Sequence, residues 1–88
     1  MHFFVYIVRC VDGTLAIGVS TVHITTLIRD INAGKGSTYT RSRLPVFLAY
    51  YEEYMNEQDA KKRQAALKAM SRDAKEHLIS IEHLKTLE

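Results

Sequence analysis

The sequence predicts an α+β fold, a three-stranded antiparallel sheet flanked by helices. Three runs rich in aromatic and β-branched residues, at 2–10, 14–19 and 46–51, are typical of strands. Two other segments place apolar residues at helical spacing, and a third helix is predicted from its N-cap residue, Asn56. The predicted order is β-β-α-β-α-α, which fits one small sheet covered by helices. The 88 residues are enough for one domain, 1–88, and no more.

The first two strands should form a hairpin. In the run HFFVYIVRC, alternation places Phe3, Val5 and Ile7 on one face and the even-numbered residues on the other. Asp12-Gly13 predicts a type I′ turn, in which both central residues take positive φ. The chain then returns through residues 14–19.

A helix should follow, because Ile24, Leu27, Ile28 and Ile31 fall at i, i+3, i+4 and i+7. Gly34 or Gly36 can supply the positive φ that ends it. Pro45 should open the third strand. Asn56 is a predicted N-cap for a helix over 57–69, and a third helix should restart at Ser71.

The charge distribution is uneven. Residues 1–51 contain five cations and two acids, and residues 52–88 contain seven cations and eight acids. No acid occurs between Ile31 and Tyr51, so an anionic partner should meet the first half of the chain. Cys10 is the one cysteine, which favours the reducing cytoplasm. The apolar N-terminal stretch is too short to span a bilayer, so no membrane association is expected.

The ordered motifs resemble a known family. Val5-Tyr6-Ile7, the Asp-Gly hairpin, a second strand ending in Gly18, and then NAGKGSTYTRSRLPV over 32–46 resemble the GIY-YIG nuclease superfamily, more narrowly its small single-domain members. The likeness spans about residues 3–79. It implies the same sheet flanked by helices.

The resemblance also implies a chemistry, the hydrolysis of DNA phosphodiesters with one divalent metal ion. In this family two tyrosines organise the attacking water, a helical arginine stabilises charge on the phosphate, and a helical glutamate holds the metal. A metal ion can polarise the phosphoryl oxygen, and a guanidinium matches phosphate geometry.

Most of these catalytic positions are substituted here. The first tyrosine position is retained as Tyr6, but the second falls on Ala16. The arginine position falls on Leu27, a common histidine position on Ile31, and the glutamate position on Gln64. Because hard cations favour carboxylates, the sequence predicts a degenerate, catalytically impaired nuclease centre with no metal site and no cofactor.

The basic motif is retained, and its side chains are candidates for nucleic-acid binding. They are Lys35, Tyr39, Arg41 and Arg43. The cations would contact phosphates, and Tyr39 could stack on a base or hold the loop to the sheet. By contrast, the consecutive cations 61–63 spread around a helix and are expected to be solvated.

Two alternatives remain beside DNA binding without cleavage. One is an active endonuclease using Mg²⁺ or Mn²⁺, with its catalytic groups relocated to Arg29, Glu52 and Glu53. The other is a protein-interaction or dimerisation module, in which Leu27 and Ile31 lie partly exposed in the former active face.

Overall fold

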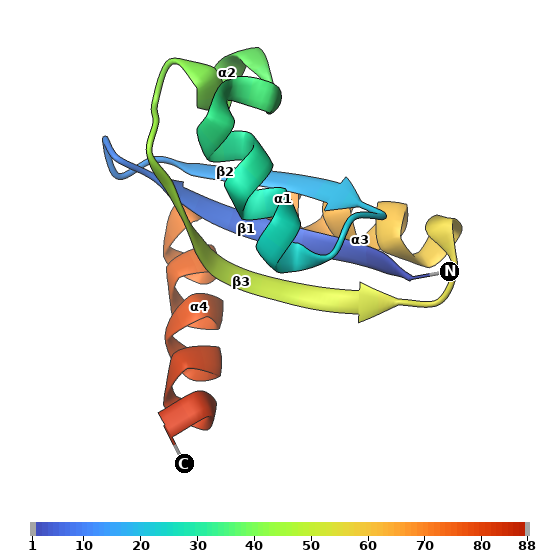
Figure 1. The fold of residues 1–88 in the computed structure, drawn as a ribbon. Coiled ribbons are helices and arrows are strands. Elements are labelled where there is room, and N and C mark those ends of the chain that lie inside the picture. Colours follow the sequence, from blue (N-terminus) through green and yellow to red (C-terminus); the bar gives the residue numbers. More distant parts are fainter. Residues whose placement is uncertain (1, 88) are drawn as a thin grey trace.

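The computed structural model describes the backbone of residues 2–87 and the side chains of residues 2–81. A three-stranded antiparallel sheet has the strand order β2-β1-β3, and helices lie against both of its faces (Figure 1). The predicted fold class is therefore confirmed. In chain order the elements are β1 (Phe3–Cys10), β2 (Leu15–Ser20), α1 (Ile24–Asp30), η1 (Ile31–Lys35), α2 (Thr38–Arg41), β3 (Val46–Tyr54), α3 (Glu57–Ala69) and α4 (Arg72–Leu87).

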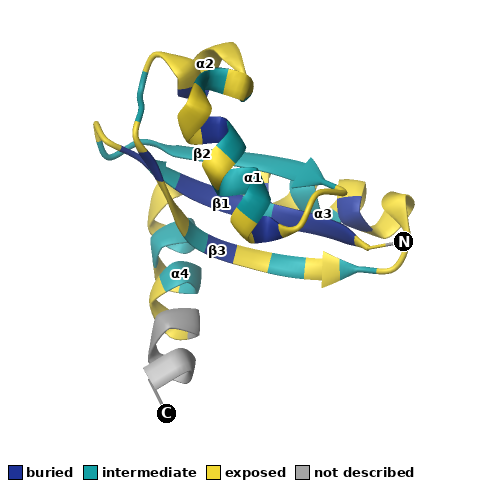
Figure 2. Cartoon of the chain, in the orientation of Figure 1, coloured by how far each residue is buried: buried dark blue, intermediate teal, exposed yellow. Residues whose placement is uncertain are grey.

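The central strand β1 is buried on both faces (Figure 2). On one face Val5 and Ile7 are fully buried in a cluster that includes Leu67 of α3. On the other face Val8 packs in a second cluster with Ile31 of η1. The predicted alternation is thus confirmed, and burial of about a dozen apolar side chains on both faces is the main stabilising term.

The β1–β2 turn differs from the predicted type I′ turn. The N–H of Gly13 donates to the carbonyl of Cys10 at 2.9 Å, so Val11 and Asp12 are the central residues. Only Gly13 has positive φ, +87°, in this turn. The prediction was wrong because the connection is a longer one, which requires a left-handed residue only after the turn. The Asp12 carboxylate accepts from the Thr14 N–H at 3.1 Å and secures this conformation.

The predicted first helix is confirmed as α1, and it continues into the wider turn η1. Gly34, at φ +88°, interrupts the helical backbone there, as one of the two glycines was expected to do. The following basic segment was expected to be a loop, yet it contains the short helix α2. Ser37 explains the difference, because its hydroxyl accepts from the Thr40 N–H at 3.3 Å as an N-cap.

Asn32 fixes this helical segment to the sheet. Its side-chain oxygen accepts from the Val46 N–H at 2.7 Å, and its amide donates to the Val46 carbonyl at 3.0 Å. Val46 is buried at the start of β3. One side chain therefore satisfies both backbone groups of a residue fourteen positions later, and it sets where the basic segment lies relative to the sheet.

Both predicted helix starts after the third strand are confirmed. Asn56 accepts from the Asp59 N–H at 2.8 Å before α3, and Ser71 accepts from the Ala74 N–H at 3.1 Å before α4. The strand β3 continues to Tyr54, three residues beyond its predicted end.

Candidate functional site

Tyr6, the retained motif tyrosine, lies on the α1 face of β1 directly opposite Gly18 in β2. A methyl group at Gly18 would lie 2.6 Å from Cζ and 3.0 Å from Cε1 of the Tyr6 ring, so the ring covers the glycine. Burial raises the pKa of the Tyr6 hydroxyl. The phenol therefore stays protonated at neutral pH, and packing against Gly18 is the role that its surroundings define.

The residues at the second tyrosine position and the arginine position have apolar side chains, and both lie in apolar surroundings. Ala16 lies opposite Val8 in the register, on the α1 face of the sheet. Ala16 and Leu27 pack, half-buried, against the same cluster as Val8. Neither side chain can hold a phosphate or a water molecule in a defined orientation.

Of the two residues predicted to form an exposed apolar face for a partner, Ile31 is buried and Leu27 is half-buried. Ile31 is only 4% exposed because it packs against Val8, Cys10 and Val46. The expectation that Ile31 lies in an open groove was therefore wrong. Leu27 is half-buried, so it offers a partner little area.

Gln64, at the predicted glutamate position, lies half-buried on α3. It is a neutral amide where the resemblance requires an anionic ligand. Within residues 2–81 no group of three or more His, Cys, Asp or Glu side chains is placed to hold a metal ion. The side chains at these positions do not fit a divalent cation, which prefers several oxygen ligands including carboxylates.

Glu52 and Glu53 were expected after the third strand, but both lie within β3 and point to opposite faces of the sheet. They cannot share one ion. Glu52 is held by the guanidinium of Arg63 at 2.9 Å and by the hydroxyls of Tyr50 and Tyr54. Glu53, on the other face, contacts His2.

The Glu52 contacts also correct the expectation that Arg63 is solvated. The Arg63 side chain is 34% exposed and the Glu52 side chain is 20% exposed. Burial by itself would raise the pKa of Glu52, but hydrogen bonds from Arg63, Tyr50 and Tyr54 outweigh it and lower that pKa. These groups form a structural link between β3 and α3, and no unpaired carboxylate is left there for catalysis.

The basic segment, defined here as residues 35–43, is divided into two kinds of cation. Lys35 and Arg41 are exposed. Arg43 is half-buried, with its Nε atom 3.1 Å from the Asp12 carboxylate and its guanidinium carbon 3.8 Å from the centre of the Tyr39 ring. It also donates to the Tyr39 carbonyl at 2.9 Å. Arg43 therefore orients Tyr39, while Lys35 and Arg41 project into solvent.

A pocket of about 450 Å³ lies at the open edge of β2, and we call it the edge pocket. Its wall on the α1 side is formed by Ser37 and Tyr39, and its opposite wall by Lys68 and Lys75. Ala16 lies between these walls. The edge pocket thus brings Ser37 and Tyr39 of the basic segment, the substituted tyrosine position Ala16 and two further cations to one place.

Lys68 and Lys75 were missed by the sequence analysis. They belong to different helices, α3 and α4, and they approach the β2 edge only because the chain turns between Ala69 and Arg72. No linear motif joins them to the basic segment. The available signal was the position of Lys68, one helical turn after Gln64, which places both on a similar face of α3.

The comparisons with known proteins come from sequence and from structure. No family model matches the chain. A UPF0213 protein of Desulfotalea psychrophila is 42% identical over 77 residues, which cover 88% of this chain and 70% of that protein. Another, from Staphylococcus haemolyticus, is 40% identical over 76 residues, which cover 86% of this chain and 92% of that protein.

The chain belongs to the UPF0213 family. The solution NMR structure of a UPF0213 protein from Bacillus halodurans matches it with a TM-score of 0.60 and 32% identity, over 92% of this chain and 85% of that one. An E. faecalis protein, also solved by NMR, matches with a TM-score of 0.62 and 28% identity, over 96% and 88% of the two chains. The UPF0213 protein of Bacillus halodurans thus shares both sequence and fold with this chain.

Among the residues that the structure describes, none of the helices is both long enough and apolar enough to cross a bilayer.

Proposed function

We propose that this UPF0213 chain binds nucleic acid at the edge pocket and the exposed part of the basic segment, and that it does so on a GIY-YIG-like scaffold without cleaving the phosphodiester. The observation behind the proposal is the edge pocket. There Lys68 and Lys75 face Tyr39 across Ala16, and Lys35 and Arg41 lie exposed in the same segment as Tyr39. Two lysines from α3 and α4 beside an aromatic ring of the basic segment suit a phosphate backbone and its bases.

The absence of cleavage follows from the groups at the motif positions. Ala16 and Leu27 provide neither a phenol nor a guanidinium, and Gln64 provides no carboxylate. Loss of one transition-state donor typically costs roughly 100- to 1,000-fold in rate, and here the arginine, the second tyrosine and the metal-binding glutamate are missing together.

The two alternatives have less support. A relocated nuclease centre would need carboxylates, but Glu52 is engaged by Arg63 and lies on the opposite face from Glu53. A partner surface on the former active face would need Ile31, which is buried. We place the binding function in the cytoplasm, where the buried thiol of Cys10 would stay reduced.

The test is a titration against labelled duplex, single-stranded and branched DNA at several salt concentrations, with Mg²⁺ present and product size followed. We expect binding that weakens with salt and no cleavage. For duplex DNA, the logarithm of the affinity falls linearly with the logarithm of the salt concentration, and each phosphate contact makes this slope steeper by about 0.9. Replacing both edge-pocket lysines, K68Q/K75Q, should make the slope shallower by about 1 to 2.

K61Q/K62Q is the matched control, because Lys61 and Lys62 are exposed lysines of α3 that do not line the edge pocket, and the two double variants remove the same charge. It should leave the slope nearly unchanged. No binding at any salt would refute the proposal. Metal-dependent cleavage would establish the nuclease alternative instead, and equal losses in K61Q/K62Q and K68Q/K75Q would mean that only net charge matters, which would refute the edge pocket as the site.

A further inference from the structure

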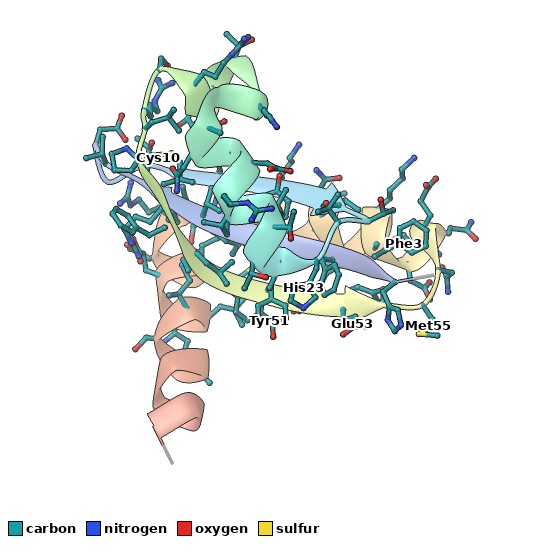
Figure 3. All side chains as sticks on the ribbon, in the orientation of Figure 1. Phe3, Cys10, His23, Tyr51, Glu53 and Met55 are labelled. Carbon is teal, nitrogen blue, oxygen red and sulfur yellow. The ribbon has the colours of Figure 1, made fainter. Side chains whose placement is uncertain are left out.

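A second pocket lies on the α1 face of the sheet, at the end away from the basic segment, and we call it the amino-terminal pocket. Its volume is about 660 Å³. It lies between the start of β1, the first turn of α1 and the end of β3. The side chains that matter here are His2, Phe4, His23, Thr25, Tyr51 and Glu53. Figure 3 shows His23, Tyr51 and Glu53 close to one another beside β3.

Aromatic rings form much of this pocket. Phe4 is buried at its base, with its ring centre 6.2 Å from that of Tyr51 and 5.9 Å from that of His23. The Tyr51 ring is 48% exposed although it lies on the same face as buried core residues. An exposed ring that packs against a second, buried ring is a suitable stacking platform for a planar heterocycle.

Polar groups at the pocket can orient such a heterocycle. The Glu53 carboxylate contacts the Nδ1 atom of His2 through one oxygen. The Nδ1 atom of His23 accepts from the Thr25 N–H at 3.4 Å. Nδ1 also lies 2.9 Å from the Thr25 hydroxyl oxygen. In the tautomer in which Nδ1 accepts, Nε2 carries the ring proton and provides a donor. An acceptor carboxylate and a polar ring nitrogen therefore lie beside the Tyr51 platform.

We propose that the amino-terminal pocket binds an unpaired guanine base of a single strand, stacked on Tyr51 and hydrogen-bonded to Glu53. The two adjacent N–H donors of guanine, on N1 and N2, match the two oxygens of a carboxylate, and one Glu53 oxygen would exchange its contact with His2 for the base. Adenine, cytosine and thymine do not present this pair of donors. Because a duplex hides these atoms in base pairs, the base must be unpaired to enter.

This inference rests on the proposed nucleic-acid binding and extends it to base recognition. The helix α1 runs from the amino-terminal pocket toward η1 and Lys35, and its six steps from Ile24 to Asp30 cover about 9 Å at 1.5 Å per residue. Arg29 is exposed on the way. A single strand could therefore place one base in the pocket while its neighbouring phosphates meet Arg29 and the basic segment.

The test compares short single-stranded oligothymidylates that differ at one central base, which is guanine, hypoxanthine (the base of inosine) or adenine. Hypoxanthine keeps the N1 donor and lacks the N2 amino group. We expect affinity to fall in the order guanine, hypoxanthine, adenine, with guanine favoured over adenine by about 5- to 150-fold, the range of a bidentate base contact. Equal affinity for the three oligonucleotides would overturn the inference.

Two variants locate the preference. Y51L should weaken binding of the guanine oligonucleotide by about 5- to 150-fold through lost stacking, and E53Q should abolish the preference for guanine over adenine. F47L is the matched control, since Phe47 is 60% exposed on the same strand but on the opposite face. It should change nothing. A preference retained in both pocket variants would place the recognition elsewhere and refute the assignment.

The design separates the two proposals. Salt-dependent binding without base preference would overturn the guanine pocket and leave the proposed function standing. No binding of any oligonucleotide would overturn both. Guanosine monophosphate, added alone and followed by the NMR signals of the Tyr51 and His23 rings, gives an independent readout. We expect shifts with guanosine monophosphate that adenosine monophosphate does not produce, and identical responses to the two nucleotides would contradict the inference.

Discussion

The close contact between Tyr6 and Gly18 gives a sharp prediction for the variant Gly18→Ala. The added methyl would lie 2.6 Å from Cζ of Tyr6, whereas ordinary contact begins at 3.4 Å. The ring must therefore move by roughly 1 Å within a close-packed cluster. Overpacking of this kind costs about 1 to 3 kcal/mol.

A smaller effect acts in the other direction. Replacing a glycine in a strand by alanine removes chain entropy from the unfolded state, which is worth about 0.5 to 1 kcal/mol. The net expectation for Gly18→Ala is a loss of about 0 to 2.5 kcal/mol in the free energy of unfolding. For a domain of this size each kcal/mol lowers the melting temperature by roughly 4 to 8 °C, so thermal unfolding followed by circular dichroism can resolve it.

The matched background is Tyr6→Leu, which removes the ring. There Gly18→Ala should be neutral or slightly stabilising, and a double-mutant cycle would give the coupling between the two positions. If Gly18→Ala raises the melting temperature of the unmodified chain, or if its effect is the same in the Tyr6→Leu background, the ring does not cover the glycine. The packing role assigned to the retained tyrosine would then be refuted.

Two further predictions concern polar links. Glu52→Gln should destabilise the fold by about 1 to 3 kcal/mol because it weakens the contacts to Arg63 and Tyr50. The pKa of Glu52 is lowered in the folded state. The stabilisation from its carboxylate is therefore present above the unfolded-state pKa and is lost as pH falls through the folded-state pKa. Denaturant unfolding at neutral and acidic pH should show the penalty shrinking on acidification, and a constant penalty would contradict the assigned cause. Asn32→Ala should cost about 1 to 3 kcal/mol because both buried backbone groups of Val46 lose their partner, and unchanged hydrogen exchange at the Val46 amide would argue against that link.

The sequence was informative about the candidate site at the level of residue identity. The chain itself shows that Tyr6 is present and that the other motif positions hold Ala16, Leu27 and Gln64. The roles of Arg43 and Arg63 could not be read in this way. Each is paired with a carboxylate distant in sequence, Asp12 or Glu52, and only the folded chain brings those carboxylates close.

Local signals determined the elements of this protein. Alternation gave the two faces of β1, and the side chains of Asn56 and Ser71 marked the starts of α3 and α4, because strand periodicity and helix capping depend on neighbours in sequence. Tertiary structure decided everything that depends on distant segments. It buried Ile31, it set Lys68 and Lys75 across the β2 edge from Tyr39, and it gathered Tyr51 and Glu53 with His23. Those neighbours are chosen by the packing of helices on both faces of one sheet, which residue spacing along the chain does not specify.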